Sequence, residues 1–139
     1  MAQTHFSGPI AVGSGQFLDL TSNTAAVTLT AADDGKTILL GGTGVTITVP
    51  PAGTHQGMHL RFVVSAAFAT DYVITNGAVD TFEGCILEAG AVQDVDAADT
   101  LTLEDGVENI GDFIEMFSDG TSWICFGNFL TAASITPAG

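Results

Sequence analysis

Apolar and polar residues alternate along most of the chain, and this period of two is the feature that most restricts its fold. The segment LLGGTGVTITVPPAG shows it clearly, because Val45, Ile47 and Val49 alternate there with threonines. Residues two apart in a β-strand point to the same face. We therefore expect a strand whose valine and isoleucine side chains face a core and whose threonines face solvent or a neighbouring subunit. Pro50 and Pro51 end this strand.

The same alternation recurs in further segments that turn residues separate from one another. These segments are AVTLT, TILL, HLRFVVSAAF, DYVIT, FEGCILEAG, DTLTLED, DFIEMF and SWICFGNF. The sequence SDGT predicts a tight turn that joins the last two into a hairpin, and the sequence GGTG fits a strand connection or bulge. No window has a convincing helical period. Short strands at this spacing predict an all-β fold, either a compact β-sandwich or a jelly-roll-like barrel.

The chain divides into an arm and one domain. Residues 1–17 are rich in glycine and contain few apolar anchors, so we expect an extended N-terminal arm there. Residues 18–139 carry the strand pattern and form a single β domain. With 46% hydrophobic residues, the 139-residue chain has enough apolar material for a core and is not a disordered protein.

The charge is strongly one-sided. Lys36 and Arg61 are the two basic residues, against sixteen acids, and the formal net charge is −14. Twelve of the acids lie between Asp80 and Asp119. Because nucleic acids and anionic membranes are bound through clustered basic groups, we expect neither as a partner. The start of the chain lacks the basic and apolar regions of a secretory signal, which favours synthesis in a cytoplasm.

Several residues are candidates for chemical sites. Asp94, Asp96 and Asp99 fall in a segment, DVDAADTLTLED, that begins like a calcium-binding loop, but the required glycine and the final glutamate are missing. We interpret them as solvated turn residues, and a loose surface cation site remains the alternative. His55 and His59 lack a third zinc ligand in the pattern, so we interpret them as surface or loop histidines.

The cysteines and the aromatic residues near the C-terminus have structural interpretations. Cys85 and Cys125 are most simply small buried hydrophobes, with a disulfide as the alternative. The aromatic side chains between residues 113 and 129 are expected in a core or a subunit contact. No nucleophile motif is recognisable, and the expectation is that the protein is not an enzyme and uses no cofactor or metal.

A resemblance adds a functional expectation. The segments KTILLGGTGVTITVPPAG, GMHLRFVVSAAFATDYVIT and IEMFSDGTSWICFGN, in this order, together with the start MAQTHFSGP, resemble the decoration, or cement, proteins of tailed-bacteriophage capsids. The resemblance implies a protein that binds the outer surface of a mature head, as a trimer, and staples neighbouring capsid subunits. Similar segments occur in phage fibres. The alternative is therefore a host-surface or glycan-binding module of a head or tail fibre, for which Trp123 and Tyr72 are the candidate sugar-binding aromatics.

The expected partners are therefore the chain itself, as a homotrimer, and the major capsid protein of the phage, with the protein located on the outer capsid surface of the virion. Contacts with the capsid or between subunits are expected at these residues: His5, Phe6, Pro9, Ile10, Thr46, Thr48 and Phe129.

Overall fold

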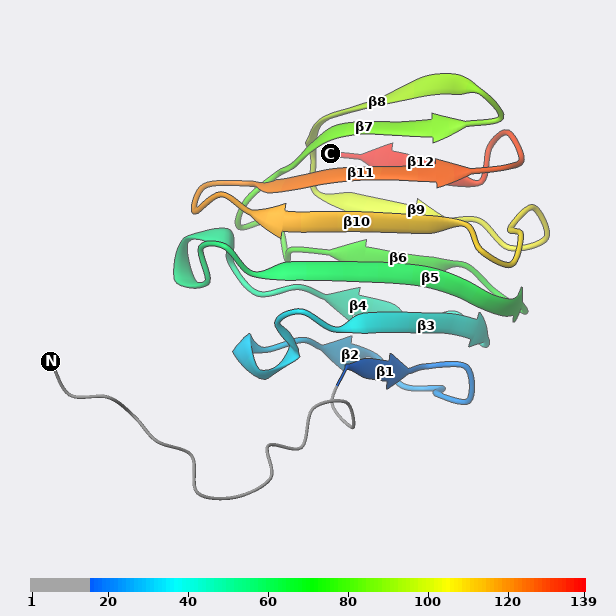
Figure 1. Cartoon of the computed structure of the whole chain (residues 1–139), viewed down its shortest axis with the longest axis horizontal. Coiled ribbons are helices and arrows are strands. Elements are labelled where there is room, and N and C mark those ends of the chain that lie inside the picture. The colour runs from blue at the N-terminus through cyan, green and yellow to red at the C-terminus, as the bar shows by residue number, and fades with distance from the viewer. Residues whose placement is uncertain (1–15) are drawn as a thin grey trace, which may run out of the picture.

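The computed structural model describes residues 16–139, which form two β-sheets packed face to face (Figure 1). About 52% of the chain lies in strands and 5% in helices, which confirms the all-β prediction. The helices are two short 3₁₀ segments, Ala31–Asp33 and Ala52–Thr54. None of the helices formed by residues 16–139 is long and apolar enough to cross a membrane.

The two sheets contain all the strands of the described chain. The larger sheet comprises β1 (Phe17–Asp19), β3 (Thr37–Gly42), β5 (His59–Phe68), β7 (Phe82–Glu88), β8 (Ala91–Ala98), β10 (Phe113–Ser118) and β11 (Trp123–Phe129). The smaller sheet comprises β2 (Val27–Thr28), β4 (Thr46–Thr48), β6 (Tyr72–Thr75), β9 (Thr100–Leu103) and β12 (Ile135–Ala138). Their orders are β1-β3-β5-β10-β11-β7-β8 and β12-β9-β6-β4-β2, and the strands of both layers lie along nearly the same axis, pointing either way (Figure 1).

The first half of the chain winds between the layers. From β1 to β6 each strand is followed by one in the opposite sheet, so β1, β3 and β5 are parallel neighbours and β2, β4 and β6 are parallel neighbours. A jelly roll is built from antiparallel strands, so this winding distinguishes the fold from that alternative. The second half adds antiparallel pairs, including the predicted hairpin of β10 and β11.

The core lies between the two sheets and follows the predicted alternation. Val45, Ile47 and Val49 are buried, while Thr46 is exposed. In β10 the inward side chains are Ile114 and Met116, whereas its two phenylalanines point outward. The same division of faces holds in β5, β6 and β9. Burial of these alternate side chains from both sheets supplies the main driving force for folding.

Trp123 and Tyr72 belong to this core, which corrects their proposed role in sugar binding. Both side chains are fully buried. The Trp123 Nε1–H donates a 2.9 Å hydrogen bond to the Pro50 carbonyl, and the Tyr72 hydroxyl lies 2.8 Å from the Gly41 carbonyl. Their polar atoms therefore tie the end of one sheet to the other, and neither ring can stack on a ligand in solution.

The GGTG segment is a strand connection, as expected: Gly41 and Gly42 end β3, and Thr43 and Gly44 lead into β4. The pairing of β3 with β5 shifts register between Leu40 and Gly42, and Gly42 has a φ of 66°. A side chain at this position would also overlap the carbonyl oxygen of Thr21. Glycine is therefore required both by the backbone conformation and by the close passage of the chain.

Three strands were missed by the sequence interpretation, and one of them changes the interpretation of the acids. Asp94 and Asp96 are exposed residues of β8 and not turn residues, and Asp99 lies in the bend that follows this strand. The others are β1, at the end of the expected arm, and β12, which contains Pro137. All three lie at the edges of the sheets.

Gly84 allows a test of the close strand packing. It pairs with Cys125 across β7 and β11, has a φ of 138°, and an added Cβ would overlap the Cys125 carbonyl oxygen. We expect Gly84→Ala to lower the free energy of unfolding by at least about 3 kcal/mol in urea titrations, since backbone strain and overpacking add.

Gly90→Ala is the matched control for this prediction. Gly90 also has a positive φ, of 81°, but an added Cβ would meet nothing within 4 Å. We expect a loss of about 1 kcal/mol, the cost of the left-handed backbone alone. Equal losses for both variants would contradict the steric explanation.

Candidate functional site

The outward surface of the smaller sheet is almost entirely threonine. Its outward residues, here called the threonine face, are Thr28, Thr46, Thr48, Val73, Thr75, Thr100, Thr102, Thr136 and Ala138. The strands place them in two rows. One row runs Thr28, Thr48, Thr75, Thr100 and Ala138, and the other runs Thr46, Val73, Thr102 and Thr136. The face carries no charged side chain.

The predicted contact residues differ in their accessibility. Thr46 and Thr48 lie next to the middle of the threonine face, so both are accessible to a partner. Phe129 is 1% exposed and packs in the core, which corrects its assignment as a surface contact. Phe129 is an even number of residues from Trp123 and Cys125 in β11, so its side chain faces the core together with theirs. The arm residues His5, Phe6, Pro9 and Ile10 lie outside the described residues.

The outward surface of the larger sheet is apolar over much of its width. Its apolar residues, here called the apolar face, are Phe17, Leu39, Val63, Leu87, Val92, Phe113, Phe117, Ile124 and Phe126. Phe17, Leu87, Val92 and Phe126 are 60%, 46%, 69% and 41% exposed. Large exposed apolar surfaces mark sites of interaction. Phe113, Phe117 and Phe126, which were expected in a core or a subunit contact, lie on this outer face, whereas Trp123 and Phe129 lie in the core.

A charged cluster lies at the centre of the apolar face. Glu115 accepts a 3.0 Å hydrogen bond from Arg61 and lies 2.8 Å from Nε2 of His59. Arg61, Val63, Gly111, Phe113 and Glu115 surround an open hollow of about 320 Å³. An arginine held beside aromatic rings and a hollow is a typical composition for the centre of a protein–protein contact.

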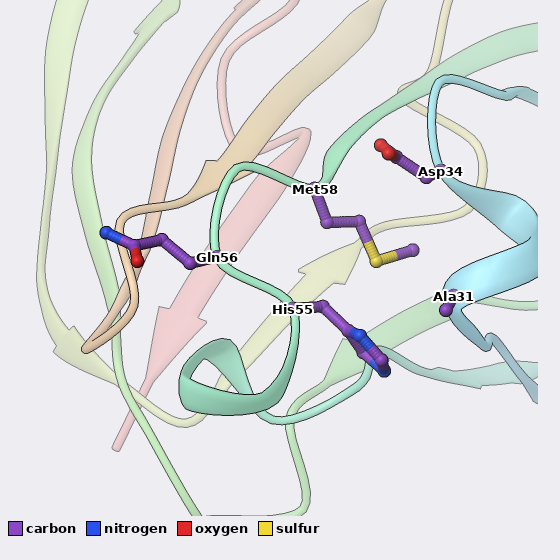
Figure 2. Close-up of a pocket in the computed structure, with 5 residues that line it drawn as sticks. All are labelled: Ala31, Asp34, His55, Gln56 and Met58. Carbon is purple, nitrogen blue, oxygen red and sulfur yellow. The ribbon is translucent and has the colours of Figure 1, made fainter. Parts of the chain in front are cut away.

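A second, smaller pocket lies at one end of the sandwich (Figure 2). It has a volume of about 130 Å³ and is lined by Ala31, Asp34, His55, Gln56 and Met58. Asp34 also accepts a 2.9 Å hydrogen bond from the backbone N–H of His59, so it is partly engaged in holding the start of β5. Within residues 16–139 no three histidine, cysteine or acidic side chains are grouped as metal ligands.

The cysteines differ from each other. Cys125 is buried, as expected, and burial raises the pKa of its thiol to about 12. Cys85 is exposed, which corrects its interpretation as a buried hydrophobe. It points to the apolar face because it is offset by one position from Gly84, the residue that pairs with Cys125. Both thiols are free, so the disulfide alternative is wrong.

Two carboxylates meet in the loops at the end of the smaller sheet. The backbone N–H of Asp105 donates a 2.8 Å hydrogen bond to Asp71. The hydrogen bond between the two carboxyl groups raises the pKa of Asp105, and the charges of Asp71 and Glu108 act in the same direction. Two neighbouring carboxylates cannot both ionise without repulsion.

Comparison with known proteins identifies no relative. No protein-family model, no curated protein and no solved structure matches the chain. The functional argument therefore depends on the two outer faces.

The acidic pair predicts a measurable pH dependence. Because the folded state raises the pKa of Asp105, its ionisation opposes folding above that pKa, and protonation relieves this effect as the pH falls through it. We expect Asp105→Asn to raise the melting temperature at pH 7. The gain should shrink as the pH is lowered through the range in which aspartate is protonated. Thermal unfolding followed by circular dichroism at several pH values measures this.

Asp119→Asn is the control of opposite sign. The Asp119 carboxylate accepts hydrogen bonds from the backbone N–H groups of Ser122 and Thr121, and these bonds lower its pKa. Its charge therefore stabilises the fold above its unfolded pKa, and this contribution disappears as the pH falls through the folded pKa. The substitution should lower the melting temperature at pH 7. If both variants shift it in the same direction, the assignment of the acidic pair is wrong.

Proposed function

We propose that the protein is a structural virion component that binds the outer surface of a phage capsid as a homotrimer and stabilises the head lattice. The single observation that carries the proposal is the apolar face, with its exposed Phe17, Leu87, Val92 and Phe126. A surface of this kind is covered by a partner when the protein is at work. The resemblance to phage decoration proteins supplies the identity of that partner, the major capsid protein or a second copy.

The charge distribution supports the same role. With a net charge of −14, copies of this chain repel one another unless their contacts avoid the acids. On the apolar face the central carboxylate, Glu115, is paired with Arg61 and His59. The exposed Asp94 and Asp96 are confined to the edge strand β8. On a closed shell many identical contacts act together, and each can be weak.

The proposed role is a non-catalytic one. A two-layer sandwich with its polar core atoms tied, such as Trp123 to the Pro50 carbonyl, suits a part that resists load. The glycan-binding alternative is less well supported, because Trp123 and Tyr72, the aromatics on which it depended, are buried.

The test uses decoration-free heads assembled from the major capsid protein of the phage. The wild-type protein should have the mass of a trimer by light scattering, sediment with the heads and occupy regular positions in electron micrographs. We expect Phe126→Asp to weaken binding at least tenfold, about 1.4 kcal/mol, since a charge replaces an aromatic contact.

Val79→Asp is the matched control. Val79 is 65% exposed but lies in the loop before β7, away from both sheet faces. Its binding should equal that of the wild type. The proposal fails if the wild-type protein is a monomer that leaves the heads bare. If the wild type binds and Phe126→Asp binds equally well, the apolar face is not the contact.

A further inference from the structure

The threonine face is a two-dimensional array and not a single stripe. One row runs across adjacent strands from Thr28 through Thr48 and Thr75 to Thr100, and the second row, which starts at Thr46 and Val73, lies two residues away from the first in β4, β6 and β9. Neighbouring strands are spaced by about 4.8 Å, and alternate residues along a strand by about 6.6 Å. The outward side chains therefore repeat at nearly constant intervals in both directions.

The array is also rigid. Threonine is branched at Cβ, so its hydroxyl and methyl groups take few positions relative to the backbone. β4, β6 and β9 are each paired on both sides, which fixes that backbone. On the inner side, Ile47, Ile74 and Leu101 are fully buried beneath the outward threonines. The hydroxyls of Thr75 and Thr100 also donate hydrogen bonds to the backbone carbonyls of Asp99 and Ala138, which restrains these side chains further.

Charge is absent from the face although the chain is strongly acidic. Asp71 comes just before β6 and Glu104 just after β9, so the carboxylates begin where the strands of the array end. An ionised carboxylate only accepts hydrogen bonds, so it orients the water molecules around it. A face made of hydroxyl and methyl groups offers donors and acceptors without imposing such an arrangement.

The nature of the array favours a particular ligand. Threonine and valine are rare among the residues that anchor protein–protein contacts, and the aromatic anchors of this chain lie on the other face. Ice is an uncharged, flat lattice of water molecules that repeats at spacings similar to those of the threonine rows. We propose that the threonine face binds the surface of ice crystals. The inference does not depend on the proposed capsid contact, which concerns the opposite sheet.

The experiment measures ice recrystallisation and crystal shape in the presence of the full-length protein. The wild type should slow the growth of ice grains and facet single crystals. Thr48→Tyr and Thr102→Tyr each place a large ring within one of the two rows, and neither threonine hydroxyl makes an intramolecular hydrogen bond within residues 16–139. We expect each variant to need at least a tenfold higher concentration for the same effect.

Thr121→Tyr is the matched control, because Thr121 is exposed in the β10–β11 turn and far along the chain from the array. It should act like the wild type. Circular dichroism and thermal unfolding establish that each variant is folded. Wild-type protein that leaves ice growth as in buffer overturns the inference, as does a folded Thr48→Tyr with full activity. A Thr48→Tyr protein that loses oligomer mass, with no wild-type effect on ice, would assign the face to a second copy instead.

Discussion

The packing of one sheet on the other determines which side chains this protein presents to its surroundings. From β1 to β6 the chain crosses between the sheets at every step, so each strand has one face against the core and one face outside. Ile47, Ile74 and Leu101 face the core. Because successive side chains of a strand point to opposite faces, Thr46, Thr75 and their neighbours must face the surface. The two outer faces are thus consequences of the core.

Parallel pairing then converts a local pattern into an ordered surface. In β2, β4 and β6 the register places Thr28 beside Thr48 and Thr48 beside Thr75. A slip of one residue would send these threonines into the core and bring isoleucine to the surface. The burial of the isoleucines therefore fixes the alignment of the threonines as strictly as it fixes the fold.

Much of the fold was predictable from the sequence, because a strand with one buried face has alternating apolar and polar residues. Ile47 and Val49 are examples. The edge strands were not predictable for the converse reason: in β8 few residues face the core, and Asp94 and Asp96 resemble a turn. The threonine rows escaped prediction for a different reason. The segments TLT and TIT share composition, but only strand order and register show that they lie side by side. Cys85 faces outward by the same period of two, because Phe82 and Ile86 are the residues of β7 that face the core.

The different chemistry of the two faces separates their roles. Exposure of the apolar face to water is unfavourable. Covering this face with protein buries its apolar side chains and packs aromatic rings around Arg61, which lowers the free energy. The hydroxyl groups of the threonine face form hydrogen bonds with water. A protein that displaces this water adds little binding free energy. A molecule docked through its larger sheet consequently turns its smaller sheet outward. In that orientation the array from Thr28 to Thr100 is the part that meets the surrounding water.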